Sequence, residues 1–489
     1  MAGAAWDRVA GRTQMARYLI GIDNGSQSSK VTVFDDRGSV VCSAREPLRP
    51  TEAPRPGYVV HPDDDLWVSI AAASRRALAA FPGDQREIAA VGLCTIRFCR
   101  ALLKDDGTLA APVMSWMDSR VARSYEHTDQ AVRYVTTSSG YITHRLTGQR
   151  RDTAANYQGV WPISTDRWEW LGDDEGFGDY GLRREMLFDL VMPGDLLGYV
   201  SRAASKCTGL PEGLAVFATA NDKAVEALGC GLRKPTTLLV SLGTYIASMA
   251  QGESNITGAA SFWTNFASVP HRYLYESHGI RRGMWTVSWW RDLLGEEALA
   301  GARKMGTSPE GYLDAVAVEV PPGSEGLMVT LDWLAPTGAP YKKGSILGFD
   351  GRHGRAHVWR AIYEGVALTV HRCAEAMGAE LGREFDELVV SGGGSASDLF
   401  MHIFADVFGL PARRGPVNDA AGLGAAICAA VGHGLYPSWD DATDNMVRRG
   451  AAFDCDLANH KLYERMSAVH ASIPELTDRV FLESYPLFG

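Results

Sequence analysis

The segment from Tyr18 to Gly38 contains the first residues whose types and spacing could do chemistry. Two apolar, β-rich runs flank the loop from Asp23 to Lys30, and this pattern is typical of a β-hairpin. The loop sets one carboxylate beside backbone N–H groups, several hydroxyls and an ammonium. Amides and Lys30 suit a phosphate, whereas Asp23 suits Mg²⁺, either directly or through water. For this loop alone, an ordinary polar turn is an equal alternative.

A second carboxylate, Asp222, follows the short apolar strand from Leu214 to Ala218 and leads a helix rich in small residues. An Asp at a helix start has an ordinary use, which is N-capping. The other interpretation makes Asp222 a general base that takes a proton from an attacking hydroxyl. The residue types alone leave both interpretations open.

Two glycine loops complete the set. Gly243-Thr244 follows the strand from Thr237 to Leu242, and its glycine and hydroxyl could receive a second phosphate. Gly392-Gly-Gly394-Ser395 separates a strand ending at Ser391 from a helix that Gly409 ends, so a ligand could approach the backbone closely there. The chain has neither the GxGxxG pattern with its acidic partner nor a GxxxxGK[ST] loop, which disfavours a dinucleotide site.

The elements that hold these loops must come from more than one core, because 489 residues exceed what one hydrophobic core usually serves. A net charge of −10 argues against a nucleic-acid-binding surface or an anionic-membrane surface. The eight cysteines form no CxxC pair, which disfavours a zinc site or a disulfide framework. No apolar run approaches the length of a membrane span. We therefore expect a cytoplasmic protein that binds neither nucleic acid nor membrane.

The expected organisation is α/β, with an N-terminal extension over 1–17, a first domain over 18–233 and a second domain over 234–489. Each half begins with a hairpin whose turn carries glycine and hydroxyls, which indicates an architectural repeat with little sequence identity. The polar, aromatic and glycine-rich stretch Thr165–Tyr180 is expected to be a surface loop.

Taken in order, these motifs resemble the FGGY family of carbohydrate kinases, and the resemblance covers the chain from Tyr18 to about Trp439. Similarity is greatest to a bacterial subgroup known only as sugar kinases, with xylulose kinases among the better-known relatives. The family implies an α/β fold of two actin/hexokinase-like (ribonuclease H-like) ATPase domains with an interdomain cleft. The anchors are Gly21-Ile-Asp23-Asn-Gly25-Ser26 with Ser29 and Lys30, Ser115-Trp116-Met-Asp118-Ser-Arg120, Leu146-Thr-Gly148, Asn221-Asp222, Gly243-Thr244, Gly392-Gly-Gly394-Ser395, Ala405-Asp406 and Gly409-Leu-Pro411.

The resemblance also implies an activity, which is ATP-dependent phosphorylation of a sugar hydroxyl with Mg²⁺. The acceptor would be a ketose such as D-xylulose, or a related polyol or sugar derivative. Asp222 would deprotonate the hydroxyl that attacks the γ-phosphorus, and Asp23 would hold the Mg²⁺ shell. The residues expected to bind the nucleotide are Gly25, Ser26, Ser29, Lys30, Gly243, Thr244, Gly393, Gly394 and Asp398. Those expected to line the sugar pocket are Arg97, Phe98, Trp116, Asp118, Asn221 and Asp222.

Three departures from the family pattern bear on the acceptor. Arg97-Phe98 stands where xylulose kinases carry Met-His, and Arg97 could hold a hydroxyl, a carboxylate or a phosphate, or serve only as a structural ion-pair partner. The span from Asp118 to Leu146 is short, so the pocket is either more open or completed by another subunit, and a homodimer stays open. Tyr245 stands where a small hydroxyl residue is common. These departures leave open a second function, that of a catalytically weak, nucleotide- and sugar-binding regulatory or sensor protein.

Overall fold

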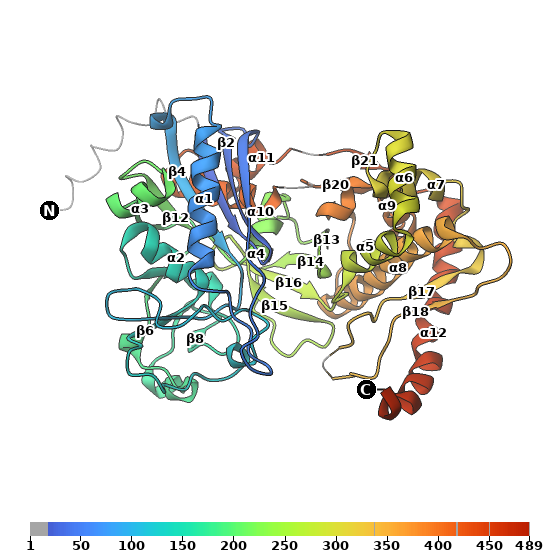
Figure 1. Cartoon of the computed structure of the whole chain (residues 1–489), viewed down its shortest axis with the longest axis horizontal. Coiled ribbons are helices and arrows are strands. Elements are labelled where there is room, and N and C mark those ends of the chain that lie inside the picture. Colours follow the sequence, from blue (N-terminus) through green and yellow to red (C-terminus); the bar gives the residue numbers. More distant parts are fainter. Residues whose placement is uncertain (1–17, 337, 417–418, 449, 489) are drawn as a thin grey trace.

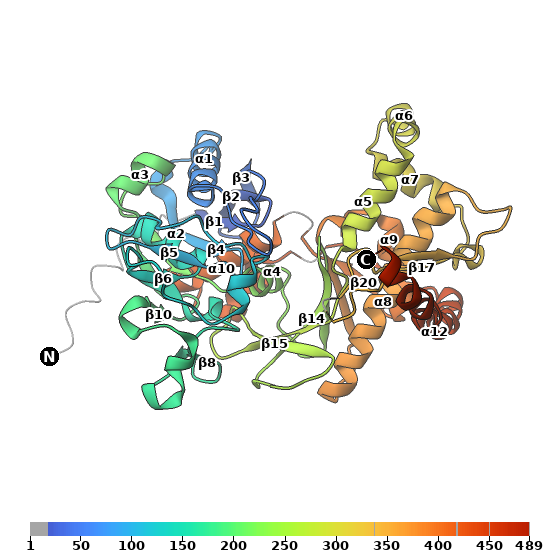
Figure 2. The same ribbon diagram turned by 60° about the horizontal axis from the view of Figure 1, so that its bottom comes forward.

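The computed structural model describes residues 18–336, 338–416, 419–448 and 450–488. The expected N-terminal extension, residues 1–17, lies outside the described residues. The described chain forms two lobes, each built around one large β-sheet (Figure 1). A second view shows helix α4 (Asp222–Gly229) of the first lobe near strands β14 (Ile246–Gly252) and β15 (Phe262–Phe266) of the second, where the two lobes meet (Figure 2).

The sheet of the first lobe has six strands, and its first three form an antiparallel meander. Strand β4 then pairs in parallel with β1, and β12 pairs in parallel with β4. In spatial order the strands are β11 (Leu196–Tyr199), β12 (Ala215–Ala218), β4 (Ile88–Thr95), β1 (Tyr18–Asn24), β2 (Ser28–Asp35) and β3 (Val40–Pro47).

The sheet of the second lobe repeats this topology. A meander of β13, β14 and β16 is followed by β19 and β20, which pair in parallel as β4 and β12 do. The order is β15 (Phe262–Phe266), β16 (Tyr273–Ser277), β14 (Ile246–Gly252), β13 (Thr237–Leu242), β19 (Glu387–Ser391), β20 (Ala412–Arg414) and β21 (Ala452–Phe453). Two sheets with the same order of antiparallel and parallel strands confirm the predicted pair of actin/hexokinase-like units.

Helices cover both faces of the first sheet because alternate residues of its strands point to opposite sides. Ile20 and Ile22 face α1 (Asp65–Ala79), whereas Leu19 faces α10 (Ala420–His433). Helix α10 and α11 (Trp439–Met446) lie between β20 and β21 of the second sheet in the chain but pack on the first sheet. The chain passes from the first large sheet to the second between β12 and β13, and the helices of 420–446 return to the first lobe.

Helix α10 also crosses α4 (Asp222–Gly229) at very short range. A methyl group on Gly424 would lie 2.0 Å from the carbonyl oxygen of Val225, and one on Gly229 would lie 1.9 Å from that of Ala420. Only glycine leaves room for two backbones this close. The crossing holds the N-terminus of α4 where the lobes meet.

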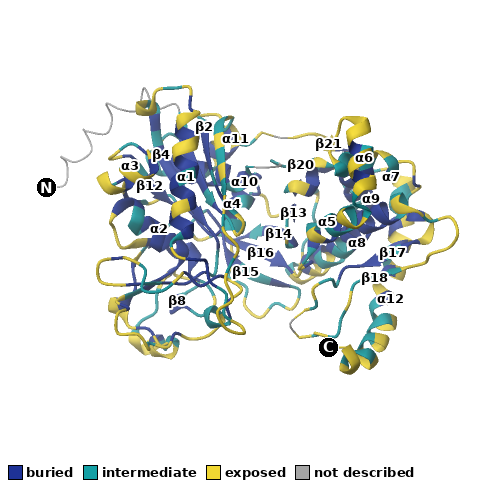
Figure 3. Ribbon diagram, viewed as in Figure 1, coloured by how far each residue is buried: buried dark blue, intermediate teal, exposed yellow. Residues whose placement is uncertain are grey.

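Long helices cover the second sheet. Helix α8 (Arg355–Leu381) packs on α9 (Asp398–Phe408), where Tyr363 and Phe400 stack with ring centroids 4.0 Å apart. Ser397 accepts a hydrogen bond from the Phe400 amide and so caps α9. Helix α12 (Leu457–Phe488) packs on α8 and α9, and Figure 3 shows that it is less buried than those two helices.

None of the described helices is long and apolar enough to cross a membrane.

The remaining helices and strands lie around the two large sheets. These elements are β5 (Ala101–Leu103), β6 (Tyr134–Thr136), α2 (Ser138–Thr147), β7 (Arg151–Thr153), β8 (Ile163–Ser164), β9 (Glu169–Trp170), β10 (Asp189–Val191), α3 (Arg202–Thr208), α5 (Gly283–Leu294), α6 (Glu296–Met305), α7 (Pro309–Ala317), β17 (Met328–Thr330) and β18 (Ser345–Leu347).

The stretch Thr165–Tyr180 differs from the surface loop that its composition predicts. It contains β9 and short 3₁₀ turns, and Trp168 is fully buried. Trp168 packs on Phe266, and the hydroxyl of Tyr273 donates a hydrogen bond to the carbonyl of Thr165. Since both partners belong to the second sheet, this stretch is a contact between the lobes, which a local sequence window does not reveal.

Candidate active site

The predicted metal ligand, Asp23, lies near the end of β1, directly opposite Lys30 on β2. Lys30 Nζ lies 2.6 Å from Oδ1 of Asp419, which precedes α10, and the hydroxyl of Thr32 donates to the same carboxylate at 3.0 Å. Asp419 is a member of this group that the sequence motifs did not identify. The first hairpin and the return of the chain from the second lobe therefore meet at one point.

Asp23 lies in strongly negative surroundings. Burial, followed by the neighbouring Asp222 and Glu226, raises the pKa of Asp23 to about 7, although Lys30 opposes the shift. Excess negative charge of this kind suits a divalent cation. Among the described residues, no group of three or more His, Cys, Asp or Glu side chains is arranged to hold a metal. The donor set thus fits Mg²⁺, which commonly takes one or two carboxylates and completes its shell with phosphate oxygens and water.

The turn after Asp23 leaves some of its predicted phosphate ligands accessible and covers one. The amide of Gly25 donates to the carbonyl of Ser28 at 3.0 Å, and Ser26 is exposed at the tip. Ser29, in contrast, is buried, and its hydroxyl is engaged with the side chains of Asn24 and Ser69. Ser29 therefore belongs to the packing between β2 and α1, while Ser26 at the tip is exposed and Lys30 is half-buried in its ion pair with Asp419.

The second predicted phosphate loop, Gly243-Thr244, joins β13 to β14, and Thr244 is exposed. The start of α5 holds this loop. The amide of Gly283 donates to the Thr244 carbonyl at 2.8 Å, and that of Met284 donates to the Gly243 carbonyl at 3.2 Å. The two hairpin turns, one from each lobe, provide glycine and hydroxyl groups in the positions that the topological repeat predicts.

Asp222 is the first residue of α4, and Asn221 is its N-cap. The side chain of Asn221 accepts from the Ala224 amide at 3.1 Å, so the capping role that the sequence left open for Asp222 belongs to its neighbour. The Asp222 carboxylate accepts from the Lys223 amide at 2.9 Å and is 31% exposed, which leaves it reachable. Burial raises its pKa, whereas Arg97 and Lys223 lower it. A reachable carboxyl with a raised pKa has the properties of a general base.

A buried network joins α4 to the end of β13. Lys223 Nζ lies 2.9 Å from Glu226 and 2.8 Å from the hydroxyl of Ser241, which in turn donates to Glu226 at 2.7 Å. The sequence motifs did not identify these residues, although the i, i+3 spacing of Lys223 and Glu226 was visible on the predicted helix. The network fixes the first turn of α4, and with it Asp222, against the second lobe.

Arg97, which was predicted to line the sugar pocket, lies beside Asp222. Its guanidinium makes a two-pronged ion pair with Glu276 of β16, at 2.8 and 3.0 Å, and its Nε lies 3.5 Å from Oδ1 of Asp222. It also lies over the rings of Trp263, at 4.8 Å, and Phe98, at 5.3 Å. Although burial opposes its charge, Glu276 raises the pKa of Arg97. Arg97 is thus an ion-pair partner that also contacts Asp222, and the pair crosses from one lobe to the other.

The other predicted sugar-site residues differ in how accessible they are. Trp116 is 50% exposed. The Asp118 carboxylate is buried and accepts from the guanidinium of Arg120 and the amide of Val59, so it organises the loop beneath Trp116. The side chain of Asn221 is also buried, against Asn265.

The predicted adenosine residues lie at the start of α9. Gly393 is exposed, and the space where a side chain would begin is open. Gly394 is buried, and a methyl group there would lie 2.8 Å from the sulfur of Met284 on α5. Asp398 is exposed and paired with Arg414. The glycine run thus brings open backbone close to the segment that holds the Gly243-Thr244 loop.

Comparisons with known proteins find the same family over both halves of the chain. The N-terminal domain of the FGGY family of carbohydrate kinases matches residues 18–133, and the C-terminal domain of that family matches residues 238–433. The uncharacterized sugar kinase YgcE of Escherichia coli K12 is 47% identical over 470 residues, which are 96% of each chain.

Solved structures show the same fold at lower identity. The xylulose kinase of Rhodospirillum rubrum superposes with a TM-score of 0.80 at 24% identity, covering 95% of this chain and 100% of its own. A gluconate kinase from Lactobacillus acidophilus also has a TM-score of 0.80, at 17% identity, with 95% and 99% covered. Because one of these proteins is a xylulose kinase and the other a gluconate kinase, the shared fold alone does not decide whether an acceptor is neutral or acidic.

Proposed function

Because the chain belongs to the FGGY family of carbohydrate kinases, we propose that it transfers the γ-phosphoryl group of ATP to a hydroxyl of an uncharged ketose, such as D-xylulose, or of a related polyol. The observation that carries the proposal is the position of Asp222. Its carboxyl is reachable, has a raised pKa, is near enough to Asp23 to raise the pKa of that residue, and is next to Lys223, which contacts Ser241 just before the Gly243-Thr244 loop.

Asp222 would act as the general base. It would accept the proton of the acceptor hydroxyl as that oxygen forms its bond to phosphorus, while the bond to the leaving ADP breaks. The raised pKa makes Asp222 a better proton acceptor than an exposed Asp, and the nearby Arg97 guanidinium favours the deprotonated form that a base requires. Proton removal at this atom contributes about 10²–10⁴-fold in typical enzymes.

The nucleotide would lie between the two hairpin turns. Gly25, Ser26, Lys30 and the Gly243-Thr244 loop would contact its phosphates, and Asp23 would hold Mg²⁺. Bound Mg²⁺ would neutralise charge on the phosphate oxygens. The adenosine would lie by the predicted residues Gly393, Gly394 and Asp398. Contacts between the lobes would exclude water from the site, where it would compete as an acceptor.

The ion pairs of Arg97 bear on whether the acceptor is neutral or acidic. Both edges of its guanidinium are in use, because Glu276 accepts from two of its nitrogens and Asp222 lies beside the third. A sugar acid would be placed beside two carboxylates and an arginine whose charge they already neutralise. The hydroxyl groups of a neutral sugar, in contrast, could donate hydrogen bonds to the same carboxylates. The arrangement supports an uncharged acceptor, with Trp116 and Phe98 as apolar surfaces for the sugar.

ADP release over a panel of pentuloses, hexuloses, polyols and sugar acids tests the proposal. We expect a neutral acceptor to stimulate turnover, and Asp222→Asn to lower kcat by about 10²–10⁴-fold with nucleotide affinity retained. Asp440→Asn, at an exposed carboxylate paired with Arg233 and outside the site, is the matched control for kcat. Turnover of the Asp222 variant at the wild-type rate would refute the assignment. Sugar binding by calorimetry without phosphate transfer would instead support the regulatory alternative. A homodimer and a cytoplasmic location remain proposals, which light scattering and cell fractionation test.

A further inference from the structure

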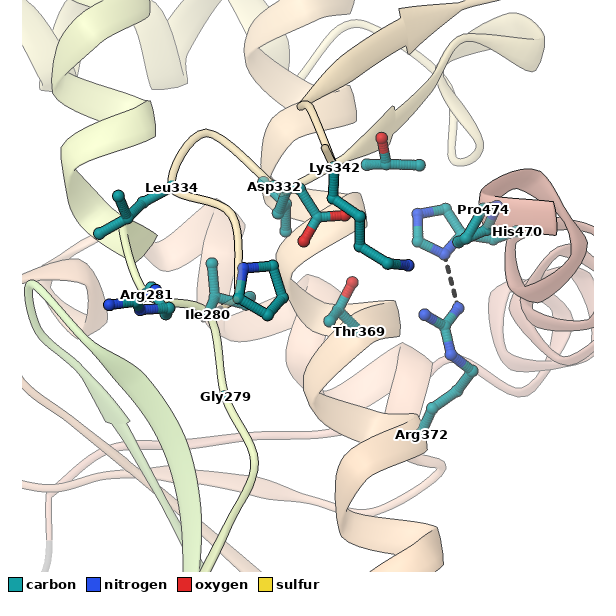
Figure 4. A pocket seen from close by; sticks show the side chains of 13 residues that line it. Gly279, Ile280, Arg281, Asp332, Leu334, Lys342, Thr369, Arg372, His470 and Pro474 are labelled. Carbon is teal, nitrogen blue, oxygen red and sulfur yellow. Dashed lines mark hydrogen bonds between the residues drawn. The ribbon is translucent and has the colours of Figure 1, made fainter. Parts of the chain in front are cut away.

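A cavity of about 220 Å³ lies in the second lobe, apart from the residues assigned to the reaction. Its walls come from the segment after β16, the segment after β17, the middle of α8 and the middle of α12 (Figure 4). Thr369 and Arg372 project from α8, Lys342 and Asp332 from the opposite wall, and His470 from α12. None of the sequence motifs singled out this region.

Arg372 carries a charge that no described acidic residue neutralises through an ion pair. Its guanidinium instead lies 2.7 Å from Nδ1 of His470. His470 Nε2 lies 2.8 Å from the carbonyl of Val329, which can only accept, so Nε2 carries the proton and Nδ1 accepts from Arg372. Burial lowers the pKa of His470, in keeping with a neutral ring. A largely desolvated guanidinium therefore borders the cavity with a neutral partner.

Most of the other charged groups around the cavity are engaged with one another. Lys342 Nζ is paired with Asp478 at 2.7 Å, and the exposed Arg281 donates to the carbonyl of Ala335. Asp332 is the acidic residue of the cavity wall, and burial raises its pKa. On α8, Glu375 lies 3.4 Å from His371, whose pKa is lowered by burial, and it opposes the lowering of the Arg372 pKa that burial causes. Arg372 is therefore the half-buried cation of the cavity wall for which the described residues provide no ion pair.

We propose that this cavity binds a small anion bearing a phosphate or carboxylate group, with Arg372 as its main ligand. The planar guanidinium matches both groups through paired hydrogen bonds, and Thr369 supplies a hydroxyl beside it. The volume is below the roughly 300–1,000 Å³ of pockets for drug-sized ligands, so it suits a small metabolite better than a nucleotide.

The cavity wall is continuous with the predicted phosphate loop of the second lobe. Ile280 exchanges two backbone hydrogen bonds with Ile246, at 3.0 and 2.8 Å, just after the Gly243-Thr244 loop. The amide of Gly283, three residues further on, binds the carbonyl of Thr244. An anion bound in the cavity would contact the wall that residues 279–281 form and would thereby bias the position of this segment. The site is therefore an effector site whose occupancy changes nucleotide affinity, and only this coupling rests on the proposed function.

Calorimetry with inorganic phosphate and with malonate tests the site, in saturating MgADP so that the interlobe phosphate loops are filled. We expect one saturable site per chain in the wild type, an affinity at least tenfold lower in Arg372→Gln, and a smaller loss in Arg372→Lys, which keeps the charge but not the fork. Arg303→Gln, at an exposed arginine paired with Glu296, is the matched control. Binding of phosphate alone would identify a phosphate site, and binding of both probes a general anion site.

Absence of saturable binding, or equal affinity in Arg372→Gln, would overturn the proposal. Should Arg372→Gln fail to fold, Thr369→Leu tests the same cavity by filling it, and unchanged binding in that variant would also overturn it. The effector role predicts that the anion changes ADP affinity by the same factor as ADP changes anion affinity, and a factor of one would refute that role. Because none of these measurements needs turnover, their failure is distinct from failure of the kinase assignment.

Discussion

Replacing Glu276 by Gln should change which acceptors the enzyme takes. Glu276 is fully buried and holds both terminal nitrogens of Arg97. The amide has nearly the same shape as the carboxylate but lacks its charge, so the substitution leaves Arg97 with Asp222 as its remaining acidic partner. Acceptors that carry a carboxylate would then find a guanidinium edge without a competing charge.

The size of the effect follows from the geometry. Arg97 lies 2.8 Å from Glu276 and 3.5 Å from Asp222, so an acceptor beside Asp222 is separated from Glu276 by one guanidinium group. At a separation of roughly 7 Å and an effective dielectric constant of about 20, two like charges repel by about 2.4 kcal/mol. Removing that repulsion should raise kcat/KM for an acidic acceptor about 50-fold relative to a neutral one.

The assay compares kcat/KM for a neutral polyol or ketose with that for the corresponding sugar acid, in wild type and variant. Glu253→Gln, at an exposed carboxylate paired with Arg272, is the control. Urea unfolding identifies any loss of folded protein, which removal of one partner from a buried ion pair can cause. A folded Glu276→Gln variant whose neutral-to-acid ratio equals that of wild type would show that this carboxylate does not set acceptor charge.

Two further predictions concern the metal end and the helix crossing. Because the pKa of Asp23 is raised to about 7, Mg²⁺-dependent ADP binding should weaken about tenfold for each pH unit below 7, where the carboxyl is protonated, and calorimetry at several pH values measures this slope. Without metal, the raised pKa of Asp23 increases the free energy of unfolding at low pH, and this stabilisation is lost as pH rises through about 7. If an Asp23→Asn variant kept the pH dependence of both ADP binding and unfolding, this carboxyl would be excluded as their source. Gly424→Ala should cost about 1–3 kcal/mol in urea unfolding, because its methyl would lie 2.0 Å from the Val225 carbonyl, whereas Gly422→Ala, with its nearest neighbour at 3.6 Å, should be neutral or slightly stabilising. Equal unfolding midpoints for the two alanine variants would contradict the close crossing of α4 and α10.

Much of the architecture could be predicted from local patterns. Alternating apolar runs around Asp23 and around Gly243 predicted the two hairpins, and the topological repeat follows from their matching turns. Ser29 shows where local reasoning needed one more step. Ser29 and Lys30 are neighbours on β2, and neighbours on a strand point to opposite faces, so Lys30 faces the site while Ser29 packs toward Ser69.

Other parts of the site depend on contacts that no sequence window contains. Glu276 is 179 residues from Arg97 and lies in a strand that is buried throughout, so its pattern indicates only a core element. Whether Asp222 caps helix α4 depended on where that helix begins. Because α4 begins at Asp222, one residue earlier than a helix capped by Asp222 would, Asn221 is the N-cap. The first residue of a helix is located this closely by hydrogen-bond geometry and not by the helix propensities of its residues.

In the proposed reaction, the interlobe contacts on either side of Asp222 would link closure of the lobes to catalysis. The Arg97–Glu276 pair joins the lobes at the acceptor end, and the hydrogen bond from Lys223 to Ser241 joins them at the base of α4. Burial, which these contacts maintain, is the largest cause of the raised pKa of Asp222. If the lobes separate, Arg97 loses Glu276, Asp222 gains water, and its pKa moves back toward that of an ordinary Asp. The carboxyl is therefore a strong proton acceptor only when the lobes are together, which is also when competing water is excluded.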